Sequence, residues 1–322
     1  MWAHLSQPEL VAEDPAYCDA VRRALARLGE YIEIIVRPLN MRPVGASILA
    51  ISRDRVEVRV TSSSSHIVIA IGPDADLAGE IFWLRTMATR NLAAHRLISH
   101  DQSGARVPFS YAILSFLGGA ALVNTADSAL VRVAARATGR TLRRAHQVIA
   151  PGFGRPTPSG RWLSNSWPMV LRAWLDSTEA LTLATHTFDS ETYAALLAAT
   201  LEHPDLACET PCLLHGAIGP ARILVTSGES IQLEALTCPG PIVAGDPLLD
   251  VATALLPSQP AAFRQGFLEG YAAVGPLDQS QRLRLRRLGV LAMLANAATQ
   301  PDPAILANLP ALVRSELRMI GG

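Results

Sequence analysis

Two stretches carry most of the information in this sequence: HGAIGPARIL at residues 215–224 and GDPLLD at residues 245–250. Each combines turn-forming glycine and proline with apolar residues that belong in an interior. The first holds one histidine and one arginine, His215 and Arg222, and the second ends on Asp250. These polar groups stand in two short motifs that lie some twenty residues apart in the sequence.

The two stretches resemble the motifs of the aminoglycoside phosphotransferase, or choline kinase-like, family. In that family the first motif reads His-Gly-Asp, four further residues, then Asn-Ile-Leu; the Asp takes the acceptor proton and the Asn holds magnesium. The corresponding positions here are Ala217 and Arg222. A second metal-binding Asp stands about seven residues before the Gly of the second motif in the family, and that position is Cys238. The resemblance therefore implies a kinase-like site that has lost its chemical groups, with no catalytic residue and no bound metal.

The resemblance gives the matching residues structural roles. It implies that His215 packs beneath the catalytic loop and that Asp250 accepts hydrogen bonds from the backbone of that loop. Gly216 belongs to the same motif, and Gly245 and Pro247 shape the turn into the next helix. Residues 215 and 250 are therefore expected to lie close together.

The kinase lysine is also missing, because all 28 basic residues are arginine. The lysine strand of the family best matches residues 66–72, HIVIAIG, and places Ala70 at the cation position. Glu80 stands where the family has the helix glutamate that pairs with this lysine. The alternative is an ordinary acid near a helix start, favoured by the helix dipole.

The resemblance and the hydrophobic pattern predict an α+β, protein kinase-like fold with two lobes. Residues 1–117 are expected to form an N-terminal helix and a small lobe with an antiparallel sheet and one helix. Residues 118–322 are expected to form a larger, mainly helical lobe. Residues 56–60 alternate between valine and charged residues, which is typical of a strand with one buried face.

Several element boundaries follow from local signals. Asp14 is expected to start a helix that Gly29 ends, and a sheet is expected between Tyr31 and Ile71. Asp76 is expected to cap the helix that carries Glu80. A helix is also expected at residues 279–298, with four arginines on a solvated face. These arginines are Arg282, Arg284, Arg286 and Arg287.

Composition excludes some classes of partner. The formal net charge is 0 and the sequence pI is about 7.1, so no broad basic field is available for nucleic acid. The N-terminus lacks the pattern of a signal peptide, and no apolar stretch has the length of a membrane span. We therefore expect a cytoplasmic protein that binds neither nucleic acid nor membrane.

The four cysteines are expected to be free thiols. One alternative is a zinc site, because His203, Cys208, Cys212 and His215 fall within a short segment. Prolines at 204 and 211 interrupt that segment, and the phosphotransferase motif already accounts for His215. Ordinary buried thiols are the preferred interpretation.

The leading functional hypothesis is a pseudokinase that acts as a binding, scaffolding or regulatory module for an unknown small molecule or protein, without a cofactor. The alternative is an atypical ATP-dependent small-molecule phosphotransferase, acting on a hydroxyl acceptor, with ATP and magnesium as cofactors. Its metal ligands would be displaced groups such as Glu229, Glu234 or Asp246, and an arginine would replace the lysine.

Two further expectations concern single residues. A non-kinase enzyme could use Cys212 or Cys238 as a nucleophile beside His215. Arg222, at the metal position, is expected to pair with an acid such as Glu234 or to bind anions in the cleft, the alternative being an exposed surface arginine.

Overall fold

The computed structural model describes residues 16–228, 230–300 and 302–321. The chain divides into two compact units, which are described separately. The first unit is Met1–Gly118 with Pro156–Arg161, and the second is Gly119–Arg155 with Trp162–Gly322. The domain division predicted at residues 117 and 118 stays a prediction.

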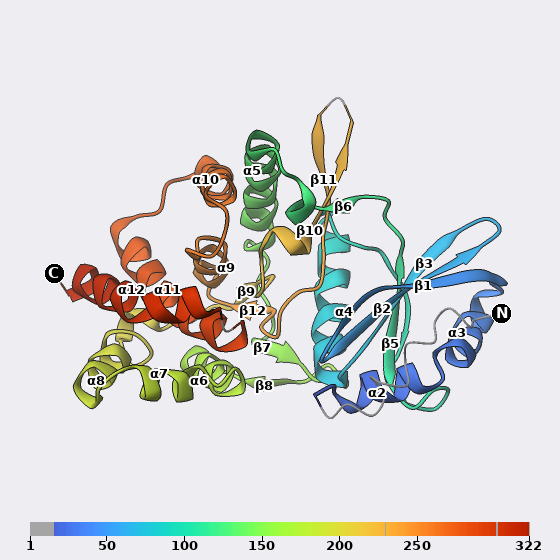
Figure 1. The fold of residues 1–322 in the computed structure, drawn as a ribbon, viewed down its shortest axis with the longest axis horizontal. Coiled ribbons are helices and arrows are strands. Elements are labelled where there is room, and N and C mark those ends of the chain that lie inside the picture. The colour runs from blue at the N-terminus through green and yellow to red at the C-terminus, as the bar shows by residue number, and fades with distance from the viewer. Residues whose placement is uncertain (1–15, 229, 301, 322) are drawn as a thin grey trace. The chain divides into compact units, whose positions relative to one another are not determined.

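The first unit is built on a five-stranded sheet in the order β1-β2-β3-β5-β4 (Figure 1). All four strand pairings in it are antiparallel. The strands are β1 (Pro43–Ser52), β2 (Arg55–Ser62), β3 (His66–Gly72), β4 (Leu97–Asp101) and β5 (Ser110–Ser115). The predicted antiparallel sheet is confirmed.

The apolar face of this sheet packs against two N-terminal helices, α2 (Asp19–Ala26) and α3 (Leu28–Val36). Val56, Val58 and Val60 are fully buried there, as the alternation in β2 predicts. The predicted sheet start at Tyr31 is wrong, and so is the helix end at Gly29, because both residues lie inside α3. The cause is helical spacing: the α3 residues buried in this core are Leu28, Ile32, Ile35 and Val36. The helix start predicted at Asp14 lies outside the described residues.

The helix α4 (Asp74–Thr89) follows β3 directly. It begins two residues before the predicted cap Asp76, with Pro73 at the N-cap position. Its first turn carries Asp74 and Asp76, which suit the positive end of the helix dipole. Glu80 lies on a buried face of this helix and is 3% exposed.

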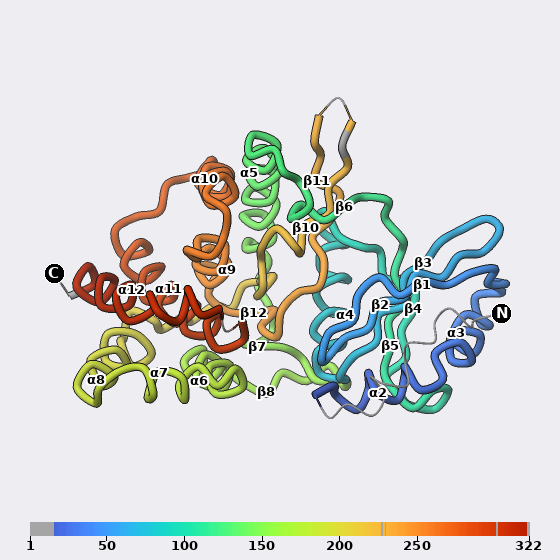
Figure 2. Tube along the Cα trace, in the orientation of Figure 1, coloured from blue at the N-terminus to red at the C-terminus, as the bar shows by residue number. Residues whose placement is uncertain are grey.

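The second unit is mainly helical, as predicted. Its helices are α5 (Ser128–Ala145), α6 (Trp167–Ser177), α7 (Ala180–Thr187), α8 (Ser190–Ala199), α9 (Leu248–Ala254), α10 (Ala261–Tyr271), α11 (Gln279–Thr299) and α12 (Pro303–Gly321). Figure 2 shows α5 and α10 side by side. They approach closely at Gly139, Gly266 and Gly270, where a β-carbon would collide with the backbone of the opposite helix.

Short strands complete the second unit. One sheet has the order β11-β10-β6, from β6 (Ala120–Ala121), β10 (Ile223–Ser227) and β11 (Ile231–Leu236). The other has the order β8-β7-β12-β9, from β7 (Phe153–Pro156), β8 (Trp162–Ser164), β9 (Cys212–Leu213) and β12 (Ala244–Gly245). The antiparallel pair β9 and β12 brings together the chain entering the first motif and the chain entering the second.

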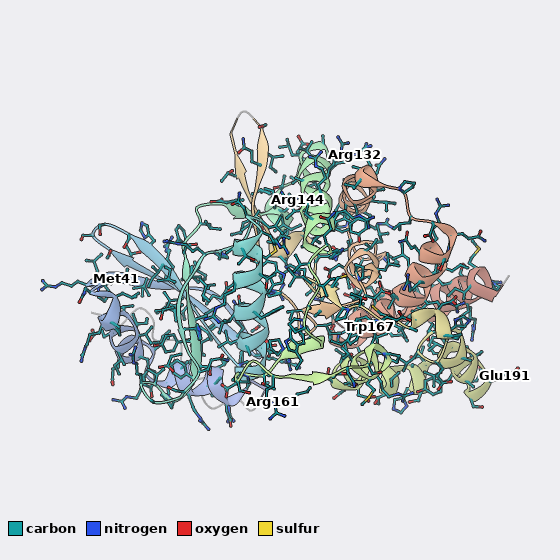
Figure 3. The ribbon with its side chains drawn as sticks, turned by 180° about the vertical axis from the view of Figure 1, so that it is seen from behind. Met41, Arg132, Arg144, Arg161, Trp167 and Glu191 are labelled. Atoms are coloured by element: carbon teal, nitrogen blue, oxygen red, sulfur yellow. The ribbon has the colours of Figure 1, made fainter. Side chains whose placement is uncertain are left out.

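Gly245, at the end of β12, lies against α6, and its expected role in shaping the turn stays a prediction. A β-carbon at this position would collide with the ring of Trp167, which is fully buried and labelled in Figure 3. Only glycine allows this contact between the turn and α6. Across the described part of the chain, every helix is too short or too polar to cross a membrane.

Candidate functional site

The loop after β9 is held by one buried carboxylate, Asp250, at the start of α9. Its Oδ2 accepts a hydrogen bond from the backbone N–H of His215 and its Oδ1 accepts one from Gly216, both at 2.7 Å. Gly216 has φ +74°, and a β-carbon there would collide with the carbonyl of Ile242. The expected closeness of residues 215 and 250 is thereby confirmed.

A second group fixes Asp250 from the end of α5. His146 Nε2 lies 3.0 Å from Asp250 Oδ2, and its Nδ1 lies 2.8 Å from the hydroxyl of Tyr271. Burial raises the pKa of Tyr271 to about 12, so its hydroxyl stays protonated and can donate to His146. His146 then donates to Asp250, which completes a buried hydrogen-bonded chain.

Burial and charge set the protonation of this framework. Burial alone would raise the pKa of Asp250, but the hydrogen bond and charge of His146, with His215, lower it overall. Burial lowers the pKa of His215 to about 4, against the opposing effect of Asp250 and with a further lowering by Arg222. His215 is therefore neutral at pH 7, and its Nε2 donates to the carbonyl of Thr237 at 3.0 Å. Asp250 is ionised and His215 is structural.

The three positions assigned to chemistry lie on the loops around this framework. Ala217 follows Gly216 directly and presents only a methyl group. Arg222 ends the short 3-10 helix Pro220–Arg222, and its side chain is half-buried. Cys238 follows β11 with a left-handed backbone, φ +51°. The framework of the loop is thus complete, while the three chemical positions hold a methyl, a guanidinium and a thiol.

Glu234, a proposed substitute ligand, lies at an irregularity in β11. The strand partners Leu224 with Ala235 and Val225 with Leu233, so Glu234 is the extra residue of a β-bulge. Its Oε2 is buried without a hydrogen-bond partner, and a β-carbon on Gly119 would collide with that oxygen. Arg222 forms no ion pair with Glu234, which removes one of the two expectations for Arg222, and its role as an anion-binding group stays a prediction. The bulge explains the missing ion pair, because it turns the carboxylate toward Gly119.

Both carboxylate oxygens of Asp246, the second proposed metal ligand, lie close to groups of the protein itself. Its Oδ1 accepts from the backbone N–H of Leu248 at 2.9 Å, and its Oδ2 lies 3.4 Å from Arg284 on α11. Burial raises its pKa, partly offset by that hydrogen bond and by Arg284. The predicted solvated face of α11 is therefore wrong in part, because Arg284 pairs inward and Arg287 is 5% exposed. Glu229, the third proposed ligand, lies outside the described residues.

The cysteine segment forms no metal centre. Among the described residues, which include all four candidate ligands, no cluster of three or more His, Cys, Asp or Glu side chains could hold a metal ion. All four cysteines are free, as predicted. Burial, then the charge of Asp246, raises the pKa of Cys212, and the same causes raise the pKa of Cys208 to about 12. These two thiols are poor nucleophiles at neutral pH.

In the first unit, Glu80 has a partner that the sequence did not reveal. Arg55, the first residue of β2, donates from Nη1 and Nη2 to the two oxygens of Glu80 at 2.7 and 2.9 Å. Its Nε donates to Glu57 at 2.8 Å. Ala70 lies in β3 with no exposed surface, directly opposite Glu57 in the strand register. Glu80 is therefore paired with an arginine of β2, and both the role that the resemblance gives it and the alternative of an ordinary acid near a helix start stay predictions.

Comparisons with known proteins agree with this architecture. The sequence pattern of the phosphotransferase enzyme family matches residues 50–285. No curated protein matches the chain in a sequence comparison. Among solved structures, a thermostable mutant of aminoglycoside phosphotransferase APH(4)-Ia is similar with a TM-score of 0.64 and 15% identity, covering 90% of this chain and 99% of that one.

Two other solved structures extend the similarity. A putative fructosamine-3-kinase from Haemophilus somnus has a TM-score of 0.61 at 14% identity, covering 88% of this chain and 97% of its own. The macrolide 2'-phosphotransferase MphH from Brachybacterium faecium has a TM-score of 0.57 at 17% identity, with 88% and 97% coverage. At these identities the likeness shows the fold, which is the predicted kinase-like fold.

Proposed function

Because the chain belongs to the phosphotransferase enzyme family, we propose that it is a catalytically degenerate member, a pseudokinase, that binds a phosphate-bearing ligand as a binding or regulatory module. One observation carries the proposal. Asp250 holds the loop at His215 and Gly216 by two short hydrogen bonds, yet the next residue is Ala217. The loop is supported as in a kinase-like site, without the carboxylate that would take the acceptor proton.

Arg222 supports a binding role over a transfer role. At the position where the family resemblance expects a magnesium ligand, it places a positive charge in a half-buried setting. A fixed cation repels a divalent metal and can itself neutralise a phosphate group. We therefore propose that Arg222 replaces the metal as the counter-charge for the ligand.

The alternative, an active phosphotransferase with displaced groups, lacks carboxylates in position. Asp246 is engaged with Arg284 and with the start of α9. Glu234 turns one oxygen into a buried contact beside Gly119. Losing a single transition-state contact commonly costs about a hundredfold in rate or more, so the combined loss should reduce transfer to background.

Variants with one polar residue replaced by alanine still bind ligands in two of the similar structures. One APH(4)-Ia structure is of a variant with an aspartate replaced by alanine, in a ternary complex with ADP and hygromycin B. Another variant, with an asparagine replaced by alanine, is in complex with AMP-PNP and hygromycin B. The proposal extends this behaviour to the present chain; its cytoplasmic location and the identity of its ligand or partner stay predictions.

The test is calorimetric titration of ATP and GTP with and without magnesium, together with product formation against aminoglycosides, choline-like alcohols and sugars. We expect binding that does not require magnesium, and no product. Arg222→Asn should weaken nucleotide binding about tenfold, the usual cost of a hydrogen bond to a charged group. Arg140→Asn, at an exposed position on α5, is the matched control and should bind as the native chain does. Turnover at about one per second or faster would overturn the proposal.

A further inference from the structure

We propose that Arg55 is a phosphate-binding group of the first unit, moved from the family's lysine strand to the strand beside it. This assignment rests on the proposed function, because it names one group, within the first unit alone, that binds a phosphate-bearing ligand. Its chemical target is a polyphosphate, for which a planar guanidinium is well suited.

Strand register gives the first argument. Ala70 faces Glu57 across the antiparallel pair of β3 and β2, and Arg55 lies two residues before Glu57 on the same side of β2. A strand alternates its side chains, so Arg55 and Glu57 share the face opposite the buried valines. From this face the side chain of Arg55 reaches Glu80 on α4, as its two hydrogen bonds show.

The way in which Arg55 is held gives the second argument. Two carboxylates from two different elements engage the Nε, Nη1 and Nη2 atoms of one guanidinium, which fixes both its plane and its direction. Its side chain is 19% exposed, whereas that of Glu80 is 4% exposed. The Glu57 side chain is 18% exposed, so one buried acid and one partly exposed acid hold the guanidinium in place, as the supporting residues of a binding group do.

The charge balance makes the proposal testable. Arg55, Glu57 and Glu80 together carry one excess negative charge, which opposes the approach of a phosphate. An ion pair that served only to join β2 to α4 would require Arg55 and Glu80 but not Glu57. Neutralising Glu57 should therefore tighten phosphate binding if Arg55 contacts the ligand, and should leave affinity unchanged if Arg55 only joins β2 to α4.

The experiment measures the affinity of the full chain for tripolyphosphate, ATP and GTP by calorimetry. Arg55→Ala should bind all three at least about tenfold more weakly, and Arg55→Lys should recover part of the loss. Glu57→Gln should bind about threefold to tenfold more tightly. Arg37→Ala, an exposed arginine of the first unit, is the matched control, and urea unfolding of each variant checks that the fold is kept. Tighter binding to ATP or GTP than to tripolyphosphate identifies a nucleotide, and equal binding identifies free polyphosphate; both support a phosphate site.

The outcomes separate this assignment from the proposed function. Equal affinities in the native chain, Arg55→Ala and Glu57→Gln would overturn the role of Arg55 and leave the proposed function standing. Failure of the native chain to bind any of the three probes would overturn both. Phosphate transfer by the native chain that Arg55→Ala abolishes would overturn the degenerate function and uphold the role of Arg55.

Discussion

The two units differ in which residues stand at the positions where the family resemblance expects charged groups. In the first unit the position in β3 where the resemblance expects a cation is Ala70, and Arg55 on β2 pairs with Glu80 through two hydrogen bonds. In the second unit Asp250 holds the loop at His215 and Gly216, and Ala217 stands where the resemblance expects a carboxylate. A cation can be supplied from any neighbouring strand, because charge acts over several ångström. A general base must lie within hydrogen-bond distance of one proton, so it is harder to relocate.

The largest effect should come from breaking the framework of the second unit. Asp250→Ala leaves His146 and two backbone N–H groups without their shared acceptor in a fully buried place. We expect a loss of about 3–5 kcal/mol in the free energy of unfolding, measured by urea titration.

Asp278→Ala is the matched control for this change. It removes the N-cap of α11, whose side chain accepts from Gln281 at 2.8 Å, and should cost about 1 kcal/mol. A similar small cost for Asp250→Ala would show that the loop does not depend on this carboxylate. The contrast between a loop that Asp250 still holds and a catalytic carboxylate that is missing at Ala217 would then have no basis.

The next effect concerns pH. The pKa of His215 falls from 6.5 to about 4 on folding, so between these values the unfolded chain binds a proton that the folded chain does not. Stability from this group is therefore present above pH 6.5 and is lost as the pH falls toward 4, by about 3 kcal/mol in total. Asp250, whose pKa is lowered, acts in the same direction at the acid end.

The measurement is urea unfolding at pH 7, 6, 5 and 4. His215→Gln can still donate to Thr237 but cannot titrate, so it should flatten the slope between pH 6.5 and 4. His186→Gln, at an exposed histidine of α7, should keep the native slope. A native slope in His215→Gln would mean that other groups control the acid sensitivity.

The sequence predicted the parts of this molecule that depend on pattern. The alternating valines of β2 predicted a strand with one buried face, and the family resemblance of the two glycine and proline motifs implied a loop held by Asp250. It did not predict Arg55, because an ion pair between β2 and α4 depends on strand register, which composition does not reveal. The bulge at Glu234 and the inward turn of Arg284 were missed for the same reason: each depends on where one element packs against another.

The smallest effect should come from the thiols, which test whether a different chemistry has entered the second unit. With the pKa of Cys208 raised from 9.0 to about 12, its thiolate fraction at neutral pH should be about a thousandfold below that of an unperturbed thiol. Alkylation by iodoacetamide, followed by mass spectrometry, should label Cys208 slowly in the native chain and quickly in urea.

A second variant, Cys212→Ser, should leave nucleotide affinity unchanged. The pKa of Cys212 is raised, and the one hydrogen bond of its Sγ among the described residues goes to the carbonyl of Thr210 at 3.9 Å. Rapid labelling of Cys208 or Cys212 in the folded protein would support the hypothesis of a cysteine nucleophile in this segment. The second unit would then contain a reactive thiol, although the expected carboxylate at Ala217 is missing.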